Sequence, residues 1–182
     1  MTTMPRRVLV AYASAAGSTA GIAERIAEVL RTAGCTVRCQ QASGDLDLQD
    51  VDVLVVGSAV HDMAWLPPSV ELLRRAAAAG AADVWCFSVG GVLPHGPLTR
   101  KLAAVEARRI GERFPAGLRT RDHRMFGGVV ELAGVPLLGR LFFRMIGGTA
   151  GDRRDWSSVE AWARGIAASL MAPGHLPPAP TC

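Results

Sequence analysis

The chain has 182 residues, of which 49% are hydrophobic and 20% charged, so it is long enough for one full hydrophobic core and resembles ordinary globular domains in composition. Its formal net charge of +4 is small and spread along the chain, which argues against a dedicated nucleic-acid-binding protein. Every long apolar run is broken by Gly, Arg or Pro before the roughly 20 residues that span a bilayer. We therefore expect one domain over residues 1–171 and a disordered, proline-rich tail over 172–182.

The cysteines and histidines predict neither disulfides nor a metal site. Cys35 and Cys39 stand four residues apart in an expected strand, too far apart along it for a disulfide. Cys86 lies in another apolar strand and Cys182 ends the tail, so we expect reduced thiols in a cytoplasmic protein. The histidines are scattered singly, without the spacing of metal ligands: His61, His95, His123 and His175.

The first half of the chain predicts three strands and one helix. An apolar run predicts a strand over 7–13. Residues 19–33 then carry apolar side chains at three- and four-residue spacing, which predicts a helix that stops at Gly34. Two further strands are expected over 35–41 and 51–58.

The second half continues the alternation. Pro67 and Pro68 suit the first turn of a helix, which is expected to run to Gly80. The last helix is expected to begin at Asp155, a favourable N-cap, and to bury one apolar face. Between these two helices the sequence predicts a strand over 82–89, a helix over 98–112 and a strand over 124–132.

Strands that alternate with helices predict an α/β domain with a five-stranded parallel sheet covered by helices on both faces. The segments 7–13, 51–58 and 82–89 are apolar almost throughout, as expected for strands buried on both sides. In such sheets ligands bind beyond the carboxyl ends of the strands, where the strand order reverses. The loops that follow these three strands are therefore the candidate site.

The first loop is small and polar, and it leads directly into a helix. The amino end of a helix presents unpaired N–H groups and a partial positive charge, for which phosphate is a common ligand. The sequence lacks both the Gly-Lys-Ser/Thr of a Walker A motif and a G-x-G-x-x-G motif. A serine-rich helix cap without a ligand is the alternative interpretation. The candidate phosphate-binding residues are Ser14, Ala15, Ala16, Gly17, Ser18 and Thr19.

The second and third loops carry groups suited to a flat aromatic ring. After the third strand we single out Ser58, Ala59, Val60, His61 and Trp65, the last two in an expected loop. After the fourth strand we single out Ser88, Val89, Gly90 and Gly91. Trp65 could instead pack ahead of the next helix, and the two glycines could form an ordinary turn. One phosphate loop and two ring-flanking loops together favour flavin mononucleotide (FMN).

These residues resemble the flavodoxin family, whose phosphate loop reads Thr/Ser-x-Thr-Gly-x-Thr. Ser14, Gly17 and Thr19 match this motif, whereas Ala16 replaces a hydroxyl residue and removes one phosphate contact. The resemblance implies the strand order 2-1-3-4-5, FMN as the cofactor, and an isoalloxazine ring held between the second and third loops. It extends over about residues 7–171.

An apolar segment with two arginines distinguishes this chain from electron-carrying flavodoxins, which are typically acidic; the sequence pI here is about 9.3. We treat 133–150 as an insertion in which Val135–Ile146 is mostly apolar and includes Arg140 and Arg144. This segment could be a short core helix, or it could contact a membrane surface or a hydrophobic substrate.

The segment, followed by Gly147-Gly148 and later by Asp155-Trp156, resembles the menaquinone-dependent protoporphyrinogen oxidase branch of flavodoxin-like proteins. That resemblance implies an FMN-dependent oxidoreductase that acts on protoporphyrinogen or another hydrophobic substrate, with a quinone as acceptor. It also implies peripheral contact with the inner face of the membrane.

Two alternatives remain open from the sequence. The chain could be a flavodoxin-type electron-transfer protein that serves a redox partner protein and has no substrate chemistry of its own. It could also be a flavin-free interaction module, as the missing hydroxyl at Ala16 would permit. We assign no side chain as a catalytic acid or base; His61 could relay protons or could be an exposed loop histidine without a role.

Overall fold

A computed structural model describes residues 5–80, 83–90, 105–130 and 151–172. Its main sheet has the strand order β2-β1-β3-β5-β6, and the short strand β4 pairs with β3 alone. The five strands along this path pair in parallel, which confirms the predicted sheet and its order. Their bounds are β1 Arg7–Ala13, β2 Thr36–Gln41, β3 Val53–His61, β4 Ala64–Trp65, β5 Val84–Gly90 and β6 Thr120–Gly127.

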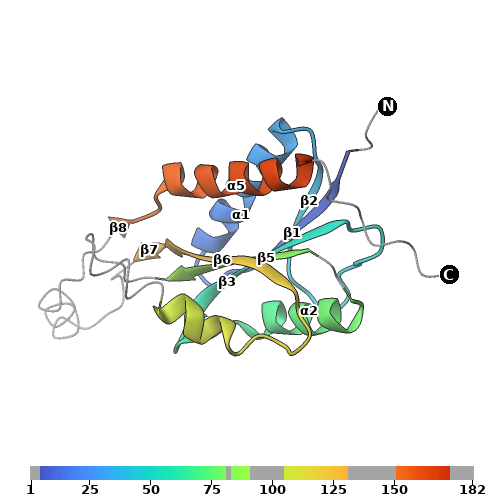
Figure 1. Ribbon diagram of the computed structural model, residues 1–182. Coiled ribbons are helices and arrows are strands. Elements are labelled where there is room, and N and C mark those ends of the chain that lie inside the picture. Colours follow the sequence, from blue (N-terminus) through green and yellow to red (C-terminus); the bar gives the residue numbers. More distant parts are fainter. Residues whose placement is uncertain (1–4, 81–82, 91–104, 131–150, 173–182) are drawn as a thin grey trace, which may run out of the picture.

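Helices cover both faces of this sheet (Figure 1). Helices α1 (Ser18–Thr32) and α5 (Trp156–Met171) lie together on one face. Helix α2 (Pro67–Ala78) and a helical stretch at 105–111 cover the other. The bounds of α1 and α2 fall within two residues of the sequence prediction. The architecture is therefore a doubly wound, three-layer α/β fold.

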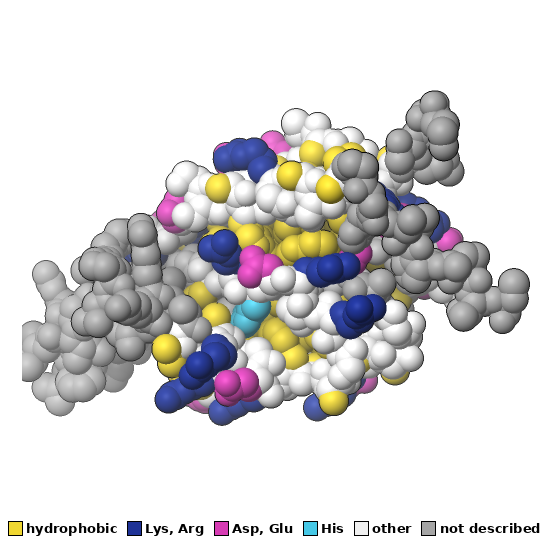
Figure 2. Space-filling model, in the orientation of Figure 1, with side chains coloured by type: hydrophobic (Ala, Val, Ile, Leu, Met, Phe, Trp, Pro, Cys, Tyr) yellow, Lys and Arg dark blue, Asp and Glu magenta, His cyan; other side chains and the backbone are white. Residues whose placement is uncertain are grey.

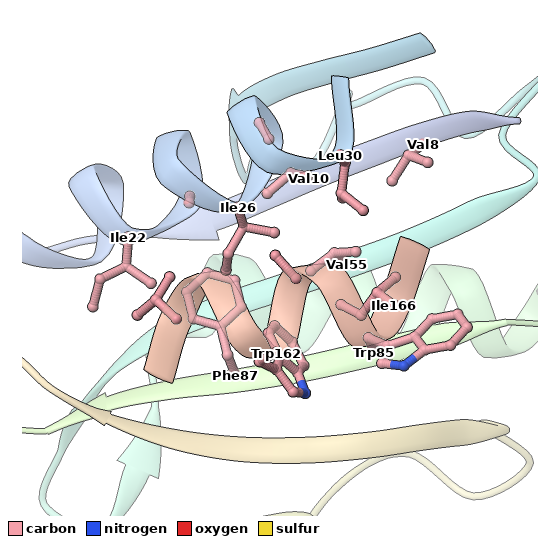
Figure 3. Close-up of a cluster of buried hydrophobic side chains, with 14 of the residues drawn as sticks. Val8, Val10, Ile22, Ile26, Leu30, Val55, Trp85, Phe87, Trp162 and Ile166 are labelled. Atoms are coloured by element: carbon pink, nitrogen blue, oxygen red, sulfur yellow. The ribbon is translucent and has the colours of Figure 1, made fainter. Parts of the chain in front are cut away.

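The buried side chains form two clusters, one on each side of the sheet. On the α1–α5 side, Ile22, Ile26 and Trp162 lie around the Phe87 ring of β5, and Ile166 lies beside Trp85 (Figure 3). On the α2 side, the cluster includes side chains that are at most 2% exposed, among them Leu54, Val56, Leu72, Leu73, Ala76, Cys86 and Ile110. Because both faces of β1, β3 and β5 are buried, these strands show almost no polar alternation.

Helix α5 begins where the sequence predicts. Asp155 is its N-cap, and the carboxylate accepts the Ser158 N–H at 3.1 Å and the Ser157 hydroxyl at 2.6 Å. The side-chain hydrogen bonds lower the pKa of Asp155 to about 2. A cap of this kind contributes about 1 kcal/mol to helix stability.

The fifth predicted strand is displaced. It was expected over 124–132, whereas β6 spans Thr120–Gly127 and Gly128 interrupts the pairing. The reason is that β6 is an edge strand, and edge strands tolerate charged residues such as Arg121 and Asp122. Two short strands, β7 (Val129–Val130) and β8 (Gly151–Asp152), form a separate antiparallel pair.

Several sequence predictions fall outside the described residues. These are the first part of the helix expected over 98–112, the insertion at 133–150 with its apolar core Val135–Ile146, Gly91, and the tail beyond residue 172. In the described ranges, no helix is long and apolar enough to cross a membrane.

Candidate functional site

The register of the sheet places the three candidate loops side by side. Ala13 at the end of β1 is paired with Ser58 of β3, and Ser58 is paired in turn with Ser88 of β5. The carboxyl ends of these strands therefore lie at one edge, where the loops after β1, β3 and β5 begin. The sequence predicts this convergence from the alternation of strands and helices alone.

The loop after β1 forms the amino end of α1. Gly17 is the N-cap residue and has a left-handed backbone with φ of 83°. Its own N–H donates to Ser14 Oγ at 2.9 Å, and its carbonyl accepts the Gly21 N–H at 3.1 Å. The N–H groups of residues 18–20 precede the first intrahelical hydrogen bond and have no acceptor within the helix. The first turn of α1 contains no acidic residue, so its positive end is not neutralised locally.

Thr19 is the most informative residue of this loop. Its side chain is 0% exposed, and its hydroxyl oxygen has no hydrogen-bond partner. An unpaired buried hydroxyl costs about 1–3 kcal/mol, so such groups are rare unless a ligand or water satisfies them. The hydroxyl lies in the first turn of α1, where a phosphate oxygen would accept it together with the free N–H groups. These residues fit a bound phosphate monoester, although Ala16 adds no donor.

The segment after β3 is a β-hairpin, not the loop expected from the sequence. His61 pairs with Ala64, and Asp62 and Met63 between them have φ of 49° and 59°, the geometry of a type I′ turn. The Arg113 guanidinium donates to the Met63 carbonyl at 3.0 Å and so holds the tip of the hairpin. The expectation of a loop was wrong because this turn lacks the Asn-Gly or Asp-Gly signal that normally marks it.

The serine side chains at this edge point into the protein. Ser58 Oγ accepts the Leu66 N–H and donates to the Ala59 carbonyl, both at 2.9 Å. Ser88 Oγ accepts the Trp65 indole N–H at 2.7 Å. Both serines are 0% exposed, so they brace the edge of the sheet, and a ring held there would meet main-chain atoms of the adjoining residues. Ala59, Val60 and Gly90 are partly exposed at this edge, and His61 is exposed.

Trp65 is a core residue in this structure. Its side chain is 6% exposed, and its ring packs against Phe114 with the ring centroids 4.7 Å apart. This is the packing role that the sequence left open as the alternative for Trp65. Its contact with a flavin ring stays a prediction, as do those of the other candidate residues.

Gly128, which the sequence did not single out, borders the candidate site on the β6 side. The Gly128 N–H donates to the Gly90 carbonyl at 2.8 Å, and a methyl group built on Gly128 would lie 3.2 Å from Ser18 Oγ. This close approach joins the start of the β7–β8 pair to the loops after β1 and β5. The Gly127-Gly128 pair could have indicated this close approach from the sequence, because glycine inside a strand often marks a place where another part of the backbone comes near.

Arginines near the site are mostly paired with carboxylates. Arg154 stacks on the Trp156 ring, 4.7 Å from its centroid, and its guanidinium makes two hydrogen bonds to Asp152. Acidic and basic side chains lie beside each other on the face shown in Figure 2, without one dominant patch of either sign. Among the described residues, no three His, Cys, Asp or Glu side chains converge as metal ligands.

Comparison with known proteins extends this description. The model of a family described as the flavodoxin domain matches residues 9–157. No curated protein matches the chain.

Solved structures match over most of the chain at low sequence identity. A flavodoxin from the domain Archaea is 15% identical with a TM-score of 0.55, and the match covers 91% of this chain and 99% of that one. The flavodoxin of Streptococcus pneumoniae TIGR4 is 14% identical with a TM-score of 0.53, over 90% of this chain and 99% of that one. These similarities show the fold.

Part of a larger oxidoreductase matches as well. Rubredoxin oxygen:oxidoreductase from Desulfovibrio gigas is 20% identical with a TM-score of 0.52, over 91% of this chain and 36% of that one. The present chain therefore spans about a third of that protein. Since the family model covers well over half of the sequence, this chain belongs to the flavodoxin-domain family.

Proposed function

We propose that the chain binds FMN at the carboxyl edge of its sheet and works as an electron-transfer flavoprotein. The observation that carries the proposal is the buried, unpartnered hydroxyl of Thr19 in the first turn of α1, below a loop that matches the flavodoxin phosphate motif. FMN, when bound, supplies one- and two-electron transfer through its ring. The chain supplies the binding, orientation and electrostatic environment.

Each part of the edge has a distinct task under this proposal. The N–H groups of residues 18–20 and the hydroxyls of Ser14, Ser18 and Thr19 hold the phosphate. Main-chain atoms at 59–61 and 89–90 flank the ring and set its hydrogen bonds, while Ser58 and Ser88 fix these two segments from below. Gly128 approaches closely enough to close the side next to Ser18.

The Thr19→Val variant tests the proposal with two effects of opposite sign. Valine has nearly the same shape but removes the unpaired hydroxyl, so the apoprotein is expected to become more stable by about 1 kcal/mol. FMN binding is expected to weaken about 10-fold or more, because a hydrogen bond to a charged phosphate is lost. Urea unfolding of the apoprotein and titration of FMN, followed by quenching of flavin fluorescence, measure the two effects.

Riboflavin, which lacks the phosphate, is the matched control ligand. Thr19→Val should leave riboflavin affinity unchanged while it weakens FMN affinity. Purified protein that takes up no FMN would overturn the proposal. Equal losses of affinity for FMN and riboflavin would remove Thr19 from the phosphate site.

A second candidate is the oxidation of protoporphyrinogen or another hydrophobic substrate, with a quinone as acceptor and peripheral contact with a membrane. It is favoured by the position of the β7–β8 pair: Gly128 at its start contacts Gly90 and Ser18, and the apolar, arginine-containing sequence of 131–150 is inserted between these two strands. A hydrophobic substrate could thus be recognised beside the cofactor. Anionic groups such as propionates or lipid phosphates suit Arg140 and Arg144.

The two candidates predict different results with the FMN-loaded protein. A porphyrinogen oxidase is expected to lose the visible absorbance of its oxidised flavin on anaerobic addition of protoporphyrinogen, and to regain it with a menaquinone analogue. An electron carrier is expected to ignore protoporphyrinogen and to exchange electrons with a flavin-dependent reductase. Substrate-driven bleaching at a rate no faster than that of free FMN would eliminate the oxidase.

A further inference from the structure

A buried chain of hydrogen bonds runs below the ring-flanking segments and connects three strands. The Trp65 indole N–H, from β4, donates to Ser88 Oγ of β5 at 2.7 Å. Ser88 Oγ is also 2.8 Å from His123 Nε2 of β6. Trp65 and Ser88 are buried, and nothing in the phosphate or ring contacts described above uses His123.

The donor and the acceptor can be assigned for each bond in this chain of hydrogen bonds. An indole N–H can only donate, so Ser88 Oγ accepts from Trp65. Since Nε2 faces Ser88, Nδ1 is the nitrogen turned towards the main chain of Ala107, which favours a proton on that side of the ring. With its proton on Nδ1, the neutral imidazole presents a lone pair at Nε2, which accepts the single Ser88 hydroxyl proton.

The surroundings of the ring favour this neutral form. His123 lies between aromatic rings, with its centroid 5.2 Å from that of Phe114 and 5.9 Å from that of Trp65. Burial lowers the pKa of His123, and the hydrogen bond to Ala107 and the charge of Asp122 only partly oppose this shift. The buried Cys86 thiol, which shares a face of β5 with Ser88, has a raised pKa and stays neutral.

Other ionisable groups lie on the elements that pack against the ring. Asp122 is its neighbour on β6 and acts on the ring as a negative charge. The hairpin tip and the helical stretch with the turn that follows it carry His61, Asp62, Glu106, Arg108, Arg109, Glu112 and Arg113.

Protonation of His123 would reverse the direction of the hydrogen bond between His123 and Ser88. The imidazolium has a proton on both nitrogens, so Nε2 would become a donor towards Ser88 Oγ. Ser88 Oγ would then accept both N–H groups through its two lone pairs, and its own proton would lose His123 Nε2 as an acceptor. Because Ser88 is 0% exposed, water cannot readily take that role. The Ser88 hydroxyl proton would be left buried without an acceptor, which carries a free-energy cost and destabilises the arrangement that holds the end of the β3–β4 hairpin.

We propose that neutral His123 is a positioning residue for FMN: through Ser88 and Trp65 it holds the β3–β4 hairpin in place against β5, and its protonation releases the hairpin and weakens flavin binding. The inference rests on the proposed function, because it assigns this hairpin to the ring. His123 itself touches neither the phosphate loop nor the edge atoms. It acts through two other side chains.

The sign of the pH dependence follows from the neutral form being favoured in the folded protein. The contribution of His123 is fully present above its ordinary pKa of about 6.5 and is lost as the pH falls below that value. FMN affinity of the wild-type protein is therefore expected to fall about 10-fold more between pH 7.5 and pH 5 than that of His123→Gln, which cannot titrate. The FMN phosphate also gains a proton in this range, and it does so equally for both proteins.

A direct readout does not need the flavin. In the apoprotein labelled with ¹⁵N, the Trp65 indole N–H signal is expected to shift as His123 titrates below pH 6.5, and to stay fixed in His123→Gln. Trp65→Phe assigns the signal. His61→Gln is the comparison variant for the other described histidine, which is exposed on the same hairpin.

The outcomes separate this inference from the proposed function. Absence of FMN binding at every pH would overturn the proposed function, whereas the indole titration would still report on the chain of hydrogen bonds. FMN binding with the same pH profile in wild type and His123→Gln would overturn the inference alone. The inference would also be overturned if His61→Gln, and not His123→Gln, removed the pH dependence of FMN affinity. A Trp65 indole signal that does not move with pH in the wild-type protein would overturn it as well.

Discussion

Replacing Gly17 with valine is expected to weaken FMN binding by about 100-fold, which corresponds to about 2.7 kcal/mol. The backbone of Gly17 is left-handed, with φ of 83°, and a β-branched residue in that region is strained by about 1–3 kcal/mol. Space is not the obstacle, since nothing lies within 4 Å of a methyl group built there. The loop would relax to another φ, and the N–H groups of residues 18–20 would no longer converge on the phosphate. Fluorescence titration with FMN measures the loss.

Gly34 provides a matched control at the other end of the same helix. It has φ of 93°, and a methyl group built there also meets nothing within 4 Å. Gly34→Val therefore introduces the same kind of strain far from the phosphate loop and should lower stability without changing FMN affinity. Equal losses of affinity in both variants would mean that the effect comes from general destabilisation, and retention of FMN by Gly17→Val would remove this loop from the site.

Gly57→Ala is expected to lower the free energy of unfolding by about 3 kcal/mol. Gly57 of β3 is paired with Phe87 of β5, and a methyl group built on Gly57 would overlap the Phe87 ring. That ring is 0% exposed and has Phe126 and Trp162 beside it, at centroid distances of 6.3 and 6.1 Å, so it has no room to withdraw. Urea unfolding followed by circular dichroism measures the change.

The control for this substitution is a glycine with free space around it. Gly165 lies exposed in the middle of α5, with nothing within 4 Å of an added methyl group. Gly165→Ala is expected to stabilise the protein by about 1 kcal/mol, because alanine is the better helix former. Adding Phe87→Leu to Gly57→Ala should recover part of the lost stability. An unchanged unfolding midpoint for Gly57→Ala would show that β3 and β5 can separate at little cost.

The sequence was sufficient for the layers of the fold and for the position of the polar loop before α1, because both depend on local patterns. Apolar runs that alternate with amphipathic segments specify a parallel sheet with helices on both faces, and β1 has the bounds that its apolar run predicts. The helix signals at Pro67 and Asp155 are also local, and both helices begin there. The small residues before α1 required only the chemistry of a helix terminus.

The remaining features depend on contacts that are distant in sequence. The hairpin after β3 is stabilised by Trp65 bonding to Ser88 and by Arg113 bonding to Met63, which no periodicity reveals. The boundaries of β6 are set by its pairing with β5 and by its edge position. For the same reason the sequence left open whether Trp65 contacts a ligand or packs in the protein, and its contact with Phe114 is visible only in the structure.

Two consecutive residues of the edge strand β6 form side-chain hydrogen bonds on opposite faces of the sheet. Asp122 accepts the Trp162 indole N–H at 2.8 Å on one side, while His123 on the other side is linked through Ser88 to the Trp65 indole. Strands at the border of a sheet usually fray first and recruit foreign strands. Here the outermost strand can detach only when bonds above and below it break together. The β6 border of this sheet is therefore part of the cooperative unit of the domain.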